Sequence, residues 1–453
     1  MPNHPNRRSF LKTAALAAAP LSFPAILRSA TPNGRLQHAC IGVGGMMGGN
    51  DFKTFMQHGK LDVVAICDVD KNHLDAAKKL APNARTYTDW RELLDKEGDK
   101  IDSVNAAVPD HMHCAIAMAA ILRKKHVYCQ KPLCHDVAEV RALTLAANKA
   151  GVVTQLGTQH ASGQGDLQAV QWLKAGIIGK VKKVYLCSNR SGAEQYRAVG
   201  PRPKEGVAAP ESLNWDLWLG TAPTRPFSPG IYHPVKWRGW QDFGTGWSGD
   251  IGCHIFDAVW KGLGLKAPKK VVAEVQESWK NSPERRGDTW PQSNHITWTF
   301  DGNGISEGPE FTVEWFDGEF FPPEEVRKLY TAGKYPEESA MVVGTEGAML
   351  IPHTHGPMLF PAEKFKDTPR PQVPVRNHYR HFVDCILEGT MTESHFGQSG
   401  PMTECILLGT VAIRTPNQEL LWDAPSMKIT NAADAEKFLR RSYRDGWKVE
   451  GVL

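Results

Sequence analysis

The sequence predicts an α/β protein with two domains: a doubly wound sheet of parallel strands first, then an α+β domain with a mostly antiparallel sheet. From residue 34 to about residue 159, short apolar runs alternate with amphipathic stretches, as in a parallel sheet covered by helices on both faces. A glycine-rich turn separates the first apolar run from the first amphipathic stretch. Beyond residue 159, long segments rich in Gly, Pro and Trp separate the apolar runs, which is typical of an antiparallel sheet with long loops.

Length and composition exclude several classes of protein. The 453 residues suffice for two domains, and 41% hydrophobic with 23% charged residues is typical of a soluble globular chain. The net charge of +4 is small and no block of Lys or Arg forms a stripe, so we expect no nucleic-acid partner.

Residues 1–30 are expected to be an export signal. Arg7 and Arg8 begin the segment Arg-Arg-Ser-Phe-Leu-Lys, and small apolar residues follow over 13–19. This order is typical of a twin-arginine signal, which directs folded proteins out of the cytoplasm. The apolar run is too short and too rich in Ala to be a stable membrane span. We therefore expect the twin-arginine export machinery as a partner and a periplasmic or otherwise exported protein. An uncleaved signal would tether it to the membrane, and a disordered tail is the alternative.

The nine cysteines are interpreted as buried thiols. Cys40, Cys67 and Cys129 fall in expected strands and Cys114 in an expected helix, and no Cys-x-x-Cys pair indicates a zinc site. A protein that folds in the reducing cytoplasm before export would use cysteine in this way.

Residues 34–158 are predicted to form the first domain. Its expected strands and helices alternate, so a ligand crevice should lie at the carboxyl ends of the strands. The strands are expected at 38–42, 63–68, 103–108, 126–129 and 152–156, and the helices at 46–57, 71–80, 90–97, 111–124 and 137–150.

Residues 159–453 are predicted to form the second domain, which would bind a substrate. A long loop-rich stretch over 192–249 interrupts it, and residues 302–308 form a further loop. Strands are expected at 182–189, 271–277, 295–300, 311–316 and 348–351, and helices at 166–175, 377–388 and 401–414.

The glycine turn carries the first functional prediction. Gly42 permits a tight turn, and Gly44 lets the backbone approach a pyrophosphate at the start of a helix. The usual third glycine of Gly-x-Gly-x-x-Gly falls at Met47, which is a departure from the pattern. The residues expected to contact a dinucleotide here are Gly42, Gly44, Gly45, Met46 and Met47.

Asp68 ends the next strand at the distance expected of a ribose-binding carboxylate. Its charge would repel a 2′-phosphate, so NAD is expected as the cofactor and NADP is disfavoured. A solvated Asp beside an ordinary glycine turn is the structural alternative.

Two further strand ends contribute to the expected crevice. Pro109 and Asp110 follow the fourth strand, where Asp110 is interpreted as the N-cap of the next helix. Lys131 follows the fifth strand, beside the expected nicotinamide, where it could take a proton from a substrate hydroxyl. A surface turn is the alternative for an isolated Lys-Pro.

Asp250 and His254 lie four residues apart, on one face of an expected helix. Asp250 is expected to be ionised and to orient His254 as a general acid/base. A structural histidine in a helix interface is the alternative.

In combination and order, these motifs resemble the Gfo/Idh/MocA oxidoreductases, the glucose–fructose oxidoreductase and inositol dehydrogenase group. The resemblance runs from about Gly34 to the carboxyl end. It implies a Rossmann domain and a second domain whose large open sheet forms the substrate floor and a homo-oligomer interface. It also implies that Lys131, Asp250 and His254 are catalytic, and that Pro109 and His113 form the strand-four element of the cofactor site. The Lys-Pro bond of the family is often cis, and its Glu before that Lys is Gln130 here.

The family's substrates are mostly sugars and cyclitols, so a carbohydrate-like substrate is expected. Aromatic rings stack on sugars and basic groups bond hydroxyls, although packing of the second domain explains each aromatic equally well. The residues expected at the substrate are Lys131, Tyr232, His233, Trp237, Arg238, Asp250 and His254. No metal site is expected: His353-Thr354-His355 is interpreted as a loop because no carboxylate or Cys lies nearby in the sequence.

Three functions remain open. The first is hydride transfer from a sugar, cyclitol or glycoside to a tightly bound NAD. The second is redox-neutral cleavage of a glycoside by the same bound NAD, through oxidation, elimination, water addition and reduction. Its additional acid and base are sought among His160, Tyr232 and His233. The third is a non-catalytic sugar-binding protein.

Overall fold

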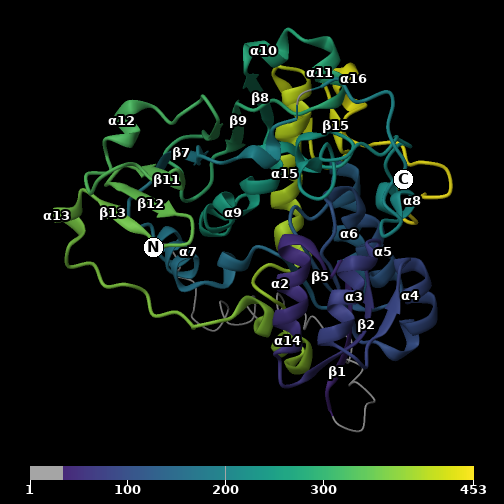
Figure 1. The fold of residues 1–453 in the computed structure, drawn as a ribbon. Helices are drawn as coiled ribbons and strands as arrows, with labels where there is room; N and C mark the ends of the chain where they lie inside the picture. Colours follow the sequence, from purple (N-terminus) through teal and green to yellow (C-terminus); the bar gives the residue numbers. More distant parts are fainter. Residues whose placement is uncertain (1–33, 199, 453) are drawn as a thin grey trace, which may run out of the picture.

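The computed structural model describes residues 34–198 and 200–452. The export signal predicted for residues 1–30 lies outside these ranges. Within them, no helix is both long enough and apolar enough to cross a membrane. Figure 1 shows two sheets, with the long helix α15 (Phe396–Arg414) running from one to the other.

The first sheet confirms the predicted Rossmann architecture. Its six strands pair in parallel in the order β3-β2-β1-β4-β5-β6. Strands β2 and β3 are added on one side of β1, and β4, β5 and β6 on the other, so the strand order reverses between β1 and β4. A ligand crevice is expected at this reversal, at the carboxyl ends of the strands. The strands are β1 (Leu36–Ile41), β2 (Leu61–Cys67), β3 (Arg85–Tyr87), β4 (Ser103–Ala106), β5 (His126–Cys129) and β6 (Thr154–Leu156). The helices are α2 (Gly45–Met56), α3 (Lys71–Leu80), α4 (Trp90–Glu97), α5 (Asp110–Leu122) and α6 (Val137–Ala150), with the 3-10 turn η2 (Gly98–Lys100).

Most helices of this domain begin at an aspartate. Asp70, Asp89 and Asp136 each accept a hydrogen bond from a backbone N–H of the first turn. The interpretation of Asp110 as a cap is wrong, because Pro109 is the N-cap of α5 and no side chain caps that helix. Asp110 instead lies in the first turn, and its carboxylate binds another element.

The second sheet has nine strands in the order β13-β12-β11-β7-β10-β9-β8-β14-β15. All of its pairs are antiparallel except β7 with β10, so the mostly antiparallel sheet was predicted correctly. The strands are β7 (Val181–Ser188), β8 (Lys270–Val275), β9 (Asn294–Asp301), β10 (Glu310–Asp317), β11 (Glu338–Gly344), β12 (Ala348–Pro352), β13 (Met358–Phe360), β14 (Leu420–Asp423) and β15 (Lys428–Ile429).

Three long helices accompany this sheet. α9 (Gly246–Leu263) contacts α7 (Gln164–Lys174), α15 and strands β7, β10 and β11. The start predicted for the last helix at Pro401 is wrong: α15 begins at Phe396 and contains Pro401. The shorter segments are η3 (Gln159–Ser162), η4 (Glu194–Tyr196), α8 (Trp215–Leu219), η5 (Lys236–Gly239), α10 (Glu277–Lys280), α11 (Pro283–Asp288), α12 (Glu324–Arg327), α13 (Ala362–Phe365) and α16 (Ala433–Glu436).

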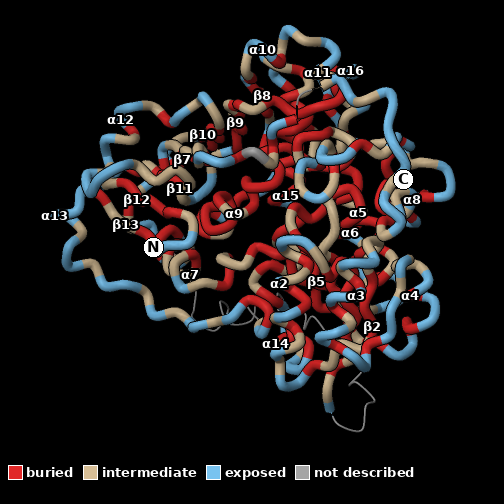
Figure 2. Tube along the Cα trace, viewed as in Figure 1, coloured by how far each residue is buried: buried red, intermediate tan, exposed pale blue. Residues whose placement is uncertain are grey.

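The two sheets share one hydrophobic core, which Figure 2 shows as a continuous buried interior. Val104 and Val127 of the first sheet belong to the same buried cluster as Val184 and Trp315 of the second. Helix α14 (His378–Glu388) packs against α2 of the first domain, although it lies far along the chain. All nine cysteines are buried and free, as predicted.

Candidate active site

A cavity of about 1090 Å³, including its open mouth, lies at the carboxyl ends of the parallel strands. Its lining includes the glycine turn after β1, Asp68 after β2, Pro109 after β4 and Lys131 after β5. Segment η5 and the residues before it complete the wall. The cavity therefore brings together residues from both domains.

The glycine turn lies close to neighbouring backbone. Gly42 has a φ of +82°, and a Cβ there would lie 2.2 Å from the carbonyl oxygen of Ala107. A Cβ on Gly48 would lie 2.8 Å from the carbonyl oxygen of Gly42. In the Gly-x-Gly-x-x-Gly pattern the third glycine, which falls at Met47 here, permits a close approach of helix and strand. In this chain Gly48 permits that approach. Gly44, Gly45, Met46 and Met47 all line the cavity.

The start of α2 fits a dinucleotide pyrophosphate. No side chain caps this helix, and its first turn contains no acidic residue. The first N–H groups of a helix lack intrahelical partners and carry a partial positive charge, so they favour a phosphate. The residues present thus suit NAD, whose pyrophosphate they would hold.

Asp68 fastens the glycine turn from the neighbouring strand. Its Oδ2 accepts hydrogen bonds from the backbone N–H of Val43 (3.0 Å) and Gly44 (3.1 Å), and its Oδ1 from that of Asp70 (2.9 Å). A carboxylate offers about four acceptor positions, so one remains for a ligand. Nδ1 of His73 lies 3.7 Å from Oδ1 of Asp68, and this carboxylate raises the pKa of His73.

Gln130 differs from the family pattern and binds a buried carboxylate. Its Nε2 donates to both oxygens of Asp51 (3.1 and 2.9 Å), and Tyr379 donates to the same carboxylate (2.7 Å). Burial raises the pKa of Asp51 to about 7. Asp51 therefore supplies a carboxyl group behind the turn of Lys131, where position 130 carries an amide.

Lys131 forms a short ion pair at the cavity wall. Its Nζ lies 2.7 Å from Oδ1 of Asp250 and also donates to the Asp250 carbonyl oxygen at 3.2 Å. Asp250 also accepts a hydrogen bond from Tyr196, and Arg238 lies 3.7 Å from its Oδ2. The Lys131–Pro132 peptide is cis, the isomer that is common in the family.

The two carboxyls near Lys131 have opposite properties. Burial alone would raise the pKa of Asp250, but Lys131 and Arg238 hold it below its usual range. Burial, and then the negative charge of Asp250, raise the pKa of Asp110. Asp110 accepts hydrogen bonds from the N–H and hydroxyl of Thr245, and so holds the start of α9 against the turn after β4.

His113 lies away from the cavity lining. Its Nδ1 is 2.6 Å from the carbonyl oxygen of Pro132, and its Nε2 is 2.8 Å from that of Val108. Burial lowers its pKa to about 4, so the ring is neutral and donates to one of the two oxygens. The structure thus places His113 between two turns of the site, where it positions Lys131 indirectly.

His254 is not hydrogen-bonded to Asp250 in the described chain. Its Nδ1 is buried without a hydrogen-bond partner, and its ring centroid lies 5.1 Å from that of His353. Burial, and then the charge of Lys131, hold the pKa of His254 well below its usual value. Asp250 therefore orients Lys131, whereas the sequence analysis expected it to orient His254. His254 lies one turn further along α9.

The other expected substrate residues fall in three places. Trp237 and Arg238 line the cavity, with the guanidinium 4.2 Å from the indole centroid. His233 also lines it, but its Nε2 lies 3.8 Å from Asp70, at the ribose end. Tyr232 is 1% exposed and packs against aromatic rings, so the packing interpretation holds for this residue.

Residues 353–355 form a turn, as predicted, and the structure brings a carboxylate that is distant in the sequence to His353. Its Nδ1 lies 3.0 Å from Oε2 of Glu338, and its backbone N–H donates to the Glu338 carbonyl oxygen. The ring centroid of His160 lies 5.0 Å from that of His353. Glu338 is the first residue of β11, a strand that the sequence analysis did not predict.

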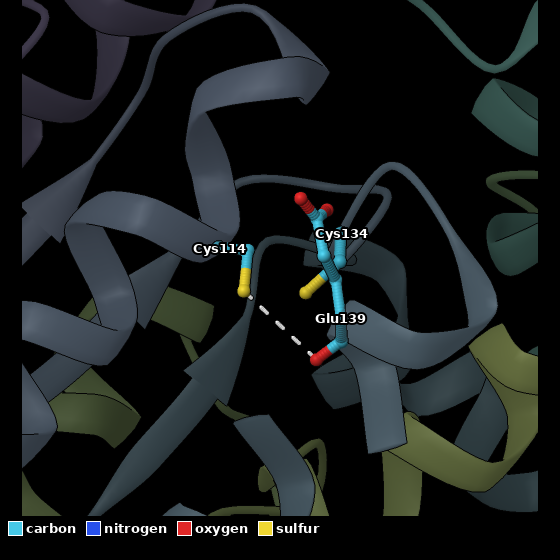
Figure 3. A group of neighbouring side chains, drawn as sticks. All are labelled: Cys114, Cys134 and Glu139. Atoms are coloured by element: carbon cyan, nitrogen blue, oxygen red, sulfur yellow. Dashed lines mark hydrogen bonds between the residues drawn. The ribbon is translucent and has the colours of Figure 1, made fainter. Parts of the chain in front are cut away.

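One group of described residues has the composition of a metal site: Cys114, Cys134 and Glu139 (Figure 3). Cys114 directs its thiol to the backbone carbonyl of Glu139. The Glu139 carboxylate accepts hydrogen bonds from Arg441, Tyr443 and a backbone N–H. Burial raises the pKa of both thiols, so the two cysteines are protonated parts of the core.

Comparisons with known proteins agree with this architecture. Residues 36–158 match a family model described as "Oxidoreductase family, NAD-binding Rossmann fold", and residues 167–306 match "Oxidoreductase family, C-terminal alpha/beta domain". Together these two matches cover more than half of the chain.

Individual relatives are more distant. An inositol 2-dehydrogenase of Salmonella typhimurium is 27% identical over 153 residues, which are 33% of this chain and 45% of that protein. A "Glycosyl hydrolase family 109 protein" of Shewanella pealeana is 25% identical over 204 residues, 39% of this chain and 44% of that protein. The chain thus spans less than half the length of these curated relatives.

Solved structures show the same fold over a longer range. An aldose–aldose oxidoreductase of Caulobacter crescentus, complexed with glycerol, has a TM-score of 0.56 and 17% identity, over 85% of this chain and 99% of that one. From the two matched family models, the chain belongs to the Gfo/Idh/MocA oxidoreductase family.

Proposed function

We propose that this protein oxidises a hydroxyl of a sugar, cyclitol or glycoside with an NAD that stays bound through turnover. The observation that carries the proposal is the ion pair of Lys131 and Asp250, whose charged atoms lie 2.7 Å apart. Lys131 lines the same cavity as the glycine turn. The names of the inositol dehydrogenase and aldose oxidoreductase relatives support a carbohydrate-like substrate.

Lys131 is the group that moves the hydroxyl proton. When bound, NAD accepts a hydride from the carbon that carries the hydroxyl. Nζ takes the hydroxyl proton, and Asp250, which contacts Lys131 and Arg238, stabilises the ammonium that forms. Trp237 offers a ring face to the C–H groups of a sugar, and Arg238 offers donors to its hydroxyls.

NAD is favoured over NADP by the charge near the glycine turn. Asp68 lines the cavity, and a carboxylate there would repel a 2′-phosphate while accepting hydrogen bonds from ribose hydroxyls. We infer NAD as the cofactor for this reason.

The amino-terminal segment supports retention of the cofactor. Arg7 and Arg8 suggest export by the twin-arginine route, and we propose a periplasmic or otherwise exported location. A soluble pool of NAD cannot be assumed there, so the cofactor would be loaded before export and reoxidised in place, by a second substrate or by the product itself. This condition favours chemistry that restores its own cofactor.

Redox-neutral cleavage of a glycoside is the second candidate. The glycosyl hydrolase relative supports it by name, and one structural observation favours it: a hydrogen-bonded His353–Glu338 pair lies beside His254. Cleavage requires an acid–base group in addition to Lys131, and this pair is a candidate.

We also propose a homo-oligomer formed through the second sheet. The sheet face opposite α9 carries a row of charged side chains, in which Glu314 pairs with Lys183 and His295, and His295 with Glu274. A polar, self-complementary row of this kind suits a contact with a second copy.

The test of the oxidation is Lys131→Met, with Lys125→Met as the matched control. Lys125 lies just before β5, at the opposite end of the strand from Lys131. Lys131→Met should lower kcat for carbohydrate oxidation by about 10²–10⁴-fold and retain bound NAD, whereas Lys125→Met should match the wild type. The panel should contain sugars, cyclitols and glycosides that the wild type oxidises. If kcat is unchanged in Lys131→Met, another residue moves the hydroxyl proton and the proposal is wrong.

A further inference from the structure

His353 is held in one orientation by contacts at its backbone and its ring. The main-chain N–H donates to the Glu338 carbonyl oxygen at 2.9 Å, and Nδ1 lies 3.0 Å from Oε2 of Glu338. The next residue, Thr354, has a φ of +71°, which is unfavourable for a β-branched side chain and persists where the surroundings enforce it. The turn thus fixes the imidazole at the end of β12.

The contact with Glu338 determines which ring nitrogen carries the proton. Burial alone would raise the pKa of Glu338, but the bonds from His353 and Ser188 and the charge of Arg190 lower it. An ionised carboxylate only accepts, so Nδ1 of His353 must donate. In the neutral ring Nε2 then carries the lone pair, and this nitrogen is buried without a hydrogen-bond partner in the described structure.

The free Nε2 belongs to a cluster of half-buried imidazoles. The ring centroids of His160 and His254 lie 5.0 and 5.1 Å from that of His353, and all three side chains keep a solvent-accessible part. His254 is one turn of α9 from Asp250, which binds Lys131. The cluster therefore lies one helical turn from the carboxylate that binds Lys131.

A second set of contacts links Glu338 to Asp250. Glu338 accepts from the hydroxyl of Ser188 (2.8 Å), which accepts from the indole N–H of Trp247 (2.9 Å). Trp247 stacks on Tyr196 at a centroid distance of 5.4 Å, and Tyr196 donates to Asp250. The two carboxylates are thus fixed relative to each other, each bound to a nitrogen group: Lys131 and His353.

We propose that His353, positioned by Glu338, is the base that removes the proton from the carbon beside a sugar carbonyl in this site. The inference rests on the proposed function, because oxidation of a ring hydroxyl supplies that carbonyl. Its substrate class is a glycoside with a ring ketone.

The step balances without a further reagent. Nε2 takes the C–H proton, the C–H electron pair forms a carbon–carbon double bond, and the carbonyl π electrons move onto oxygen as an enolate. Where the aglycone lies on the next carbon, the enolate electrons return and expel its oxygen. That oxygen takes a proton from the imidazolium, which gives an alcohol and an unsaturated ketone and restores neutral His353.

Deuterium exchange into a supplied ketone tests the step without any oxidation. The probe is methyl 3-ketoglucopyranoside in deuterated buffer, and mass spectrometry follows the C–H positions beside its carbonyl and the release of methanol. His353→Gln should slow enzyme-catalysed exchange by about 10²-fold or more. His355→Gln is the matched control on the same turn, because His355 is exposed and bonds only the turn itself, and it should exchange like the wild type.

The positioning role of Glu338 has its own readout, nitrogen NMR of His353 in the intact protein. The wild-type ring should be the neutral tautomer protonated at Nδ1, and Glu338→Gln should lose this preference while Glu338→Asp retains part of it. Wild-type exchange in His353→Gln, equal loss in His355→Gln, or a wild-type ring protonated at Nε2 would each overturn the proposal. Carbohydrate oxidation without catalysed exchange would overturn this step alone and leave the oxidation intact.

Discussion

At the residue scale, Gln130 illustrates how a departure from a family motif is compensated by its surroundings. Its amide donates to Asp51, a buried carboxyl that also binds Tyr379. A Glu at position 130 would place two carboxylates against each other in a site without solvent. The Gln therefore follows from Asp51, and the two residues should behave as one unit.

A double-mutant cycle tests this coupling. We expect Gln130→Glu to reduce the free energy of unfolding by about 1–3 kcal/mol at pH 8, because it buries a second charge without a donor. Adding Asp51→Asn should recover much of the loss, since the Asn amide can donate to the new Glu. Urea unfolding of both single variants and the double variant measures the coupling. Additive effects, within about 0.5 kcal/mol, would show that the two positions act independently.

Lys131 and Asp250 were predicted from the sequence as site residues because each lies in a motif with a fixed place on the fold. The contact between Lys131 and Asp250 was not predicted, because the spacing of Asp250 and His254 on one helix face suggested a contact between those two. The structure shows that Asp250 turns to Lys131 instead, from a strand end 119 residues earlier. Attraction between a buried acid and a cation decides this choice, and a helical pattern contains no information about it.

At the element scale, the start of α2 depends on the absence of one side chain. A Cβ on Gly48 would lie 2.8 Å from the Gly42 carbonyl oxygen, whereas a Cβ on Gly49 would lie at an ordinary 3.7 Å from its nearest atom.

Gly48→Ala should therefore push α2 away from the turn and weaken NAD binding by tenfold or more. Gly49→Ala is the matched control and should leave binding unchanged, with a slight gain in helix stability. Calorimetric titration of cofactor-stripped protein with NAD compares the two. Equal affinities would contradict this account of the turn.

Most elements of the first domain were predictable because each has an apolar run or a capping aspartate. Strand β3 has neither: Arg85 and Thr86 are exposed, and the strand is three residues long. Strand β11 was also missed, and with it the contact between Glu338 and His353. Strand pairing brings the two together, because Ser339 lies opposite Pro352 in the ladder of β11 with β12. Contacts that arise from register between strands are not visible in local sequence.

At the scale of the whole molecule, the two domains are bound together in several places. α15 packs on both α6 and α9, and α14 returns to the first domain, where Tyr379 and Phe382 contact Phe55 and Tyr128. The cavity between the domains is therefore built on a shared core. A ligand held there would contact residues of both domains.

The cofactor content of the purified protein tests the central claim most directly. Protein isolated without added nucleotide should release about one NAD or NADH per chain when a sample is denatured and analysed by chromatography. The undenatured remainder should turn over a carbohydrate substrate with no cofactor added, when a second carbonyl-bearing substrate is supplied as the hydride acceptor. An empty protein that becomes active only on addition of NAD would contradict the account.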